Sequence, residues 1–197
     1  MIVEEEFTEP TERTKNHMNR HFAFGLLLLP SLTFAQERYA TRTGEVSFFS
    51  HTPVEDIDAV NHKATCVADL SGGQIQVSML IKAFEFEKAL MQEHFNENYM
   101  ESNTFPKGEF KGTIKGITAE DARKSGKFPV TLEGELIIHG VAQKRSIPGT
   151  IEVDATGALK ATAEFVVKPA DHGIKVPGGV NVAEEISVKA ALDLRKM

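Results

Sequence analysis

The sequence of 197 residues contains no tryptophan, two tyrosines and one cysteine. The lone Cys66 cannot form an intramolecular disulfide, and its apolar neighbours favour a buried structural thiol over a reactive one. The chain also lacks a cluster of Lys and Arg, and its net charge is -6. Because binding to a phosphate backbone depends on clustered basic side chains, this balance argues against a nucleic-acid partner.

Motifs that carry catalysis or hold cofactors are missing as well. The sequence has no His-Glu-x-x-His spacing, no Gly-x-Ser-x-Gly turn, and no glycine-rich loop that follows a strand and opens a helix. We therefore expect no enzyme, no metal site and no cofactor. One catalytic alternative stays open, in which His139 or His94 acts as a general base on a lipid-like substrate.

The sequence does contain apolar residues in alternating order. Hydrophobic side chains recur with a period of two, which is typical of half-buried strands. In residues 74–82, for example, Ile75, Val77, Met79 and Ile81 fall on one face. Strands are expected at 44–51, 61–70, 74–82, 108–117, 128–138, 145–153, 159–167 and 186–194.

Eight strands joined by tight turns are sufficient to close a small up-and-down barrel. Glycines at Gly112 and Gly134 suggest strands that are bent or crowded, as closure requires. Pro148 lacks a backbone N–H, so we expect a bulge or an interruption of strand pairing there. The predicted fold class is therefore all-β, with one antiparallel barrel.

One segment departs from the period of two. From Glu85 to Tyr99, apolar residues recur at intervals of three and four, which predicts a short amphipathic helix. We expect this helix to lie across one mouth of the barrel. The irregular segment from Lys168 to Gly179, rich in Pro and Gly, is expected to border a mouth as well.

The N-terminus has the order of an export signal. From Met18, a basic segment is followed by an apolar run and then by small residues that end at Ala35. Residues 1–17 carry five acidic side chains, the wrong charge for the start of such a signal. We therefore expect translation to begin at Met18 and cleavage to follow Ala35.

This reading divides the chain into an extension and signal at 1–35 and a barrel domain at 36–197. It predicts a periplasmic or secreted protein with no integral membrane span after cleavage. The alternative is an amphipathic N-terminal helix with an uncleaved apolar anchor.

Three segments carry a resemblance to a known family: Met91 to Ser102, Leu132 to Val141, and Phe165 to Val176. Over about residues 40–196 the chain resembles the YceI-like, polyisoprenoid-binding proteins. The resemblance implies an extended eight-stranded antiparallel lipocalin-like barrel with a short helix across one mouth. It also implies that an isoprenoid or fatty, lipid-like molecule occupies the interior, and it does not imply an enzyme.

The chain departs from the family at one point. Many members carry an Arg-Asp pair just before the helix His, where this chain has Met91 and Gln92. An Arg can hold a diphosphate through bidentate contacts, whereas Met cannot. A neutral or weakly polar lipid is therefore as consistent with the sequence as a prenyl diphosphate.

The candidate ligand-binding residues are apolar side chains around the predicted helix and two histidines near a mouth. They are Phe84, Phe86, Leu90, Met91, His94, Phe95, Met100, Phe105, Phe110 and His139. A stripe of Phe and Met is equally typical of a packed core. The alternative function is thus a solidly packed barrel that serves in protein interaction or stress response. The oligomeric state stays open, a dimer included.

Overall fold

The structure is a computed structural model that describes residues 37–53, 55–176 and 182–197. The expected extension and export signal at 1–35 lie outside the described residues. All eight predicted strands are present, together with one very short strand. The strands are β1 (Arg38–His51), β2 (Asp56–Asp69), β3 (Gln74–Leu80), β4 (Glu85–Phe86), β5 (Lys107–Lys115), β6 (Gly126–Ile138), β7 (Val141–Val153), β8 (Leu159–Val167) and β9 (Ile186–Lys196).

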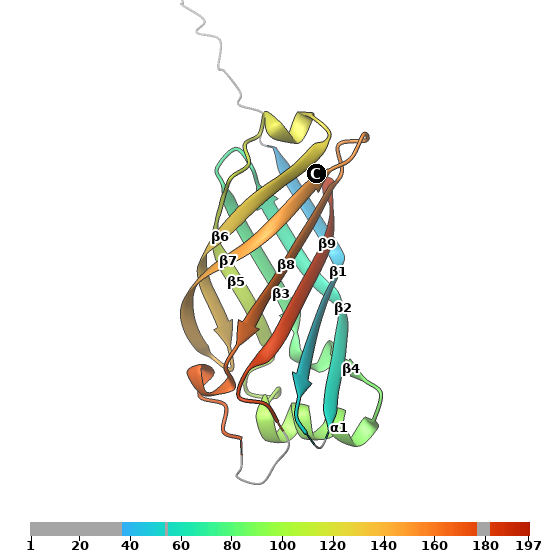
Figure 1. Cartoon of the computed structure of the whole chain (residues 1–197), viewed down its shortest axis with the longest axis vertical. Helices are drawn as coiled ribbons and strands as arrows, with labels where there is room; N and C mark the ends of the chain where they lie inside the picture. The colour runs from blue at the N-terminus through green and yellow to red at the C-terminus, as the bar shows by residue number, and fades with distance from the viewer. Residues whose placement is uncertain (1–36, 54, 177–181) are drawn as a thin grey trace, which may run out of the picture. The chain divides into compact units, whose positions relative to one another are not determined.

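Eight strands close into a single antiparallel barrel (Figure 1). Each long strand pairs with its neighbour along the chain, and β1 closes the sheet by pairing with both β2 and β9. The two-residue β4 adds to the side of β2. Alternating apolar residues and short turns favour this closure because it satisfies the backbone hydrogen bonds of both sheet edges. The predicted fold class is confirmed.

The two ends of the barrel are built differently (Figure 1). The α1 end carries η1 (Ile81–Ala83), α1 (Ala89–His94), the π-helical turn η2 (Phe95–Tyr99) and η4 (Pro169–His172). The opposite end, which we call the η3 end, carries η3 (Asp121–Arg123) and tight turns. The described part of the irregular segment after Lys168 therefore borders the same mouth as α1.

The helix at the mouth is shorter than the predicted span from Glu85 to Tyr99. Glu85 and Phe86 pair with β2 as a strand, and α1 begins only at Ala89. The Phe86 ring packs against Phe95, with ring centroids 5.0 Å apart. Packing of this side chain against the barrel thus overrides the helical periodicity of the first turn.

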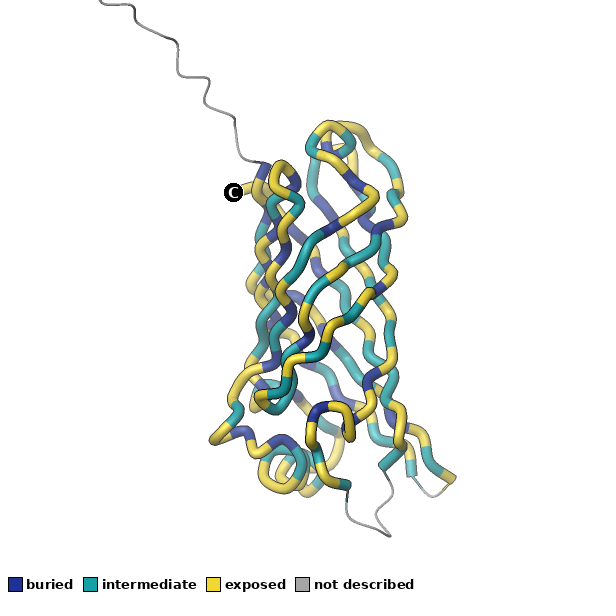
Figure 2. The backbone as a smooth tube through the Cα atoms, turned by 90° about the vertical axis from the view of Figure 1, so that its left-hand side faces the viewer, coloured by how far each residue is buried: buried dark blue, intermediate teal, exposed yellow. Residues whose placement is uncertain are grey.

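Buried, partly buried and exposed residues are interspersed along the strands of the barrel (Figure 2). Leu159 and Leu194, which face inward near the η3 end, are each 1% exposed. From the middle of the barrel toward the α1 end, several inward-facing apolar side chains keep partial exposure although they point away from bulk solvent. These are Val77, Met79, Leu132, Ile138, Ala163, Phe165, Val188 and Ala190. Protein interiors are normally close-packed, so this exposure marks a hollow.

The barrel wall is incompletely paired between β7 and β8. Their ladder runs from the η3 end only as far as Gly149, which pairs with Ala163. The next residue toward the α1 end is Pro148, which has no N–H to donate, as the sequence predicted. Beyond it, the Arg145 guanidinium donates a hydrogen bond to the carbonyl of Val166. We call this stretch the β7–β8 seam.

Two glycines allow β5 and β6 to cross closely. Gly112 pairs with Gly134, and a Cβ atom on either would overlap the backbone of the other strand. The crowding expected at Gly112 and Gly134 is therefore present. It lies between β5 and β6, which pair along the edge of β6 that faces away from β7.

Candidate functional site

An apolar cavity of about 500 Å³ runs inside the barrel and is lined by all eight barrel strands. It extends from Leu159 near the η3 end to Glu55 and His94 at the α1 end. From Ile57 to Ala68, the lining spans about 36 Å of β2 at 3.3 Å per residue, or about 28 Å along the barrel axis for a typical strand tilt. Because His94 is also exposed, the cavity meets the surface beside α1.

The structure brings most of the predicted site residues together around this cavity. Seven line it: Phe84, Phe86, Met91, His94, Phe95, Met100 and Phe110. The other three do not. Leu90 is 61% exposed on the outer face of α1. Phe105 packs against the imidazole of His139, with ring centroids 4.3 Å apart, and neither residue belongs to the lining.

His139 has a clear structural role in the hairpin between β6 and β7. Its φ is 51° and that of the following Gly140 is 73°, so both residues of this two-residue turn are left-handed. Such turns match the twist of the flanking strands. A Cβ atom on Gly140 would lie 2.8 Å from the Phe105 ring, so glycine is also required sterically.

Four phenylalanines attach the helical segment to the barrel. Phe48, Phe84, Phe86 and Phe95 form a cluster in which paired ring centroids lie 5.0 to 5.8 Å apart. These distances are typical of favourable aromatic pairs. All four rings also line the cavity. The cluster therefore positions α1 and at the same time forms the apolar wall beneath it.

Several polar residues of the lining lie at the α1 end, while Thr150 and Thr162 lie nearer the η3 end. Those at the α1 end include Ser50, Glu55 and Tyr99, which the sequence did not single out, together with His94. Glu55 accepts a hydrogen bond from the Lys88 ammonium at 2.7 Å. The Ser50 hydroxyl accepts one from the backbone N–H of Ala183 at 3.0 Å. These residues lie at strand ends or in connections, where a period of two carries no signal.

A buried histidine fastens η4 to the barrel. His172 is 0% exposed, and its Nδ1 lies 3.1 Å from the carbonyl oxygen of Val141 at the start of β7. Burial lowers the pKa of this imidazole because it disfavours the charged form. The Gln143 side-chain amide also donates to the carbonyl of Asp171 at 2.6 Å. A backbone carbonyl and a side chain of β7 thus hold the segment that follows β8.

Three further features of the described residues bear on function. Over residues 37–53, 55–176 and 182–197, no three His, Cys, Asp or Glu side chains come together as metal ligands. None of the helices described there is long and apolar enough to cross a membrane. Burial raises the pKa of the Cys66 thiol to about 12, so this thiol stays protonated at neutral pH.

Solved structures show the same fold at low sequence identity. A polyisoprenoid binding domain from Saccharophagus degradans superposes with a TM-score of 0.68 at 10% identity, covering 83% of this chain and 100% of that one. BcnA from Burkholderia cenocepacia gives 0.64 at 16% identity, covering 78% and 96%. The YCEI protein of Campylobacter jejuni gives 0.52 at 12%, covering 95% and 100%.

No protein of curated function matches the chain by sequence. The sequence profile of the YceI-like domain does match, from residue 39 to residue 194. This match includes every barrel strand except the ends of β1 and β9. Because this profile covers most of the chain and the barrel matches solved structures of the same fold, the chain belongs to the YceI-like family.

Proposed function

We propose that this protein is an exported carrier that holds an isoprenoid or other long-chain apolar lipid inside the barrel and does not alter it chemically. The observation that carries the proposal is the hollow toward the α1 end, where inward-facing apolar side chains remain partly exposed. A long chain placed there would remove this surface from water, and each buried CH₂ group contributes about 0.8 kcal/mol.

Family membership and one structural relative support the same function. The relative from Saccharophagus degradans is described as a polyisoprenoid binding domain. The seven candidate residues that line the cavity, Phe110 and Met91 among them, would contact the chain. The alternative of a solidly packed barrel would leave inward-facing residues such as Phe165 and Val188 buried, whereas both are partly exposed.

Mass spectrometry of the protein from its natural source tests the proposal. Under native conditions, we expect a barrel that carries one long-chain lipid, which organic extraction then releases and identifies. Under denaturing conditions, the mass of the chain reports its N-terminus, and export predicts a chain that begins at Gln36. Repeated recovery of an empty barrel would refute the carrier function, and a retained N-terminal segment would refute cleavage after Ala35.

A further inference from the structure

We propose that the barrel selects lipids with an uncharged head group and discriminates against anionic ones such as fatty acids and prenyl diphosphates. This inference rests on the proposed function, because it concerns the part of the ligand that stays nearest the surface. The η3 end is closed by buried apolar side chains such as Leu159 and Leu194, while the cavity meets the surface at the α1 end, where Ser50, Glu55, His94 and Tyr99 line it. The head group therefore belongs beside α1.

The described cavity lining offers no positive charge to an anionic head. It contains no Lys or Arg. Lys88 and Lys111, which contact acidic residues of the lining, already pair with Glu55 at 2.7 Å and with Glu109 at 3.2 Å. Lys175 lies between two lining residues, Ile174 and Val176, but is itself exposed and outside the lining. An anion that enters the mouth would lose water without gaining a partner, which is unfavourable.

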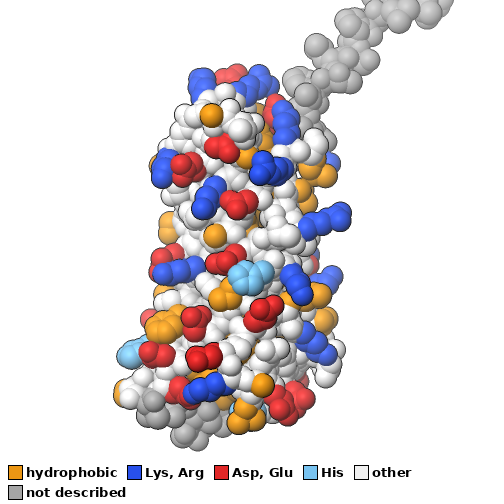
Figure 3. Space-filling model, turned by 90° about the vertical axis from the view of Figure 1, so that its right-hand side faces the viewer, with side chains coloured by type: hydrophobic (Ala, Val, Ile, Leu, Met, Phe, Trp, Pro, Cys, Tyr) orange, Lys and Arg blue, Asp and Glu red, His pale blue; other side chains and the backbone are white. Residues whose placement is uncertain are grey.

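The surroundings of the mouth add to this effect. The connections between barrel strands at the α1 end, over the described residues 52–53, 55, 81–106, 139–140, 168–176 and 182–185, contain nine Asp and Glu and four Lys, a net charge of -5. The corresponding connections at the η3 end, residues 70–73, 116–125 and 154–158, sum to -1. Acidic side chains gather toward the α1 end of the barrel in Figure 3. This field repels anions as they approach.

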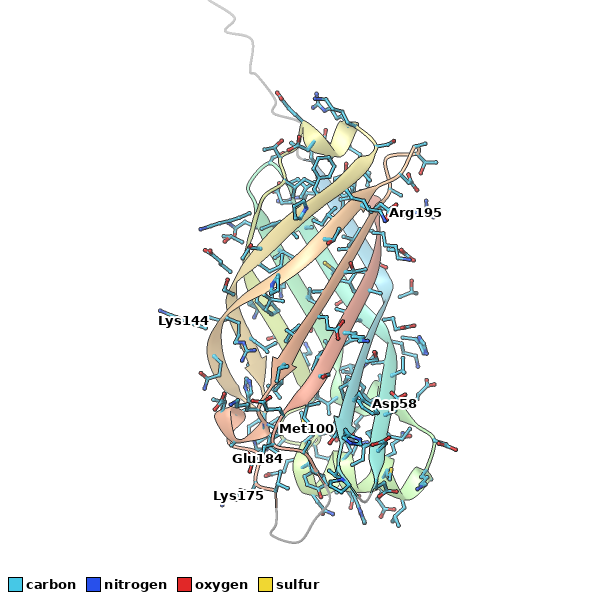
Figure 4. All side chains as sticks on the ribbon, viewed as in Figure 1. Asp58, Met100, Lys144, Lys175, Glu184 and Arg195 are labelled. Atoms are coloured by element: carbon cyan, nitrogen blue, oxygen red, sulfur yellow. The ribbon has the colours of Figure 1, made fainter. Side chains whose placement is uncertain are left out.

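A cationic head is not favoured by the lining either. The two acidic residues of the lining, Glu55 and Glu109, are paired with Lys88 and Lys111. The remaining polar groups at the mouth, Ser50, His94 and Tyr99, are suited to hydrogen bonds with an uncharged hydroxyl, amide or carbonyl. Met100, which Figure 4 labels toward the α1 end with Lys175 and Glu184, is a buried apolar residue of the same lining. An uncharged head is thus the class that the mouth accommodates without an unpaired charge.

The direct test compares ligands that share one chain and differ only in the head. Hexadecanol, hexadecanamide, hexadecanoate and hexadecylammonium compete with a fluorescent lipid probe at pH 8, where the carboxylate is ionised. We expect the alcohol and the amide to bind at least tenfold more tightly than the carboxylate and the ammonium. Equal or tighter binding of either charged ligand would overturn the inference.

A pair of charge variants tests the cause. Met91→Arg places a cation in the lining, and Leu90→Arg places the same charge on the outer face of the same helix. We expect Met91→Arg to raise the affinity for hexadecanoate at least tenfold over wild type, with little change for hexadecanol, and Leu90→Arg to leave the ratio between the two ligands nearly unchanged. An equal response of both variants would mean that overall charge, and not the lining, decides selection.

The outcomes separate this inference from the proposed function. If none of the four ligands displaces the probe, and native protein contains no lipid, the carrier function fails. If hexadecanoate binds as well as hexadecanol, the carrier function stands and only the selection for uncharged heads is wrong.

Discussion

Leucines at two depths of the same barrel have very different surroundings. Leu159 is 1% exposed and packed at the η3 end, whereas Leu132 faces the hollow part of the interior and is only partly buried. Both side chains point inward from long strands. Their contributions to stability should therefore differ because their packing differs, although the sequence pattern is the same.

We expect Leu159→Ala to lower the free energy of unfolding of the lipid-free protein by about 2–5 kcal/mol, the usual cost of a truncated core leucine. Leu132→Ala should cost clearly less, since fewer neighbouring atoms lose a contact. Urea denaturation of both variants after lipid extraction measures the difference. Equal losses would show that the empty barrel is packed around Leu132 as well.

At the residue scale, the sequence predicted which side chains face inward better than which ones line the cavity. The period of two correctly placed Phe110 inside. The sequence did not reveal that Met91 lines the cavity while Leu90 faces outward. With only six residues, α1 has too few turns for hydrophobic periodicity to show which face points inward. The sequence predicted His139 as a ligand contact near the mouth. Its left-handed φ instead places it in a turn, and hydrophobic periodicity does not identify turn positions.

At the scale of elements, regular strands were predictable and their attachments were not. The alternating pattern of residues 128–138 and 159–167 corresponds to β6 and β8, since both strands have one face inward along their whole length. The docking of η4 depends on a hydrogen bond between His172 and Val141, 31 residues apart. No local pattern reports a contact of that separation.

The attachment of η4 should weaken in mild acid. The pKa of His172 is lowered by burial, so the unfolded chain binds a proton at a higher pH than the folded one. The stability that this neutral imidazole contributes is present above the unfolded pKa of about 6.5 and is lost as the pH falls toward the lowered folded value. The free energy of unfolding should therefore decrease in that window.

Denaturation of wild type and His172→Phe at several pH values measures this contribution. The variant should show a shallower decrease below pH 6.5 than wild type, because it lacks the titrating group. His62→Phe serves as the matched control, since His62 is exposed and pairs only with Glu45 on the surface. Parallel pH profiles for wild type and His172→Phe would contradict the role of His172.

At the scale of the whole molecule, the length of the cavity sets a length for the ligand. The lining extends about 28 Å along the barrel axis, and the η3 end closes it with buried side chains. A chain that enters beside α1 gains contacts with each added CH₂ group until it meets this closed end. Longer chains would leave their excess in water.

We expect the affinity for linear alcohols to rise with chain length and then to level off. Thermal denaturation with each alcohol at a fixed concentration reports this affinity, because a tighter ligand stabilises the folded state more. A ligand at 100 times its Kd stabilises it by about 2.7 kcal/mol. Medium-chain alcohols that fill only part of the cavity serve as the internal reference. A stabilisation that is independent of chain length would place the bound molecule outside the barrel.

We expect the β7–β8 seam to let the wall of this barrel widen. In a fully paired barrel, separating any two neighbouring strands breaks a complete ladder of backbone hydrogen bonds. Here, toward the α1 end, contacts such as that of Arg145 with Val166 replace the ladder beyond Gly149. Side chains can change rotamer and re-form such bridges over a wider gap. The packed η3 end thus limits the length of the bound lipid chain. A wall that widens at the seam would accommodate a thicker chain, such as one with methyl branches.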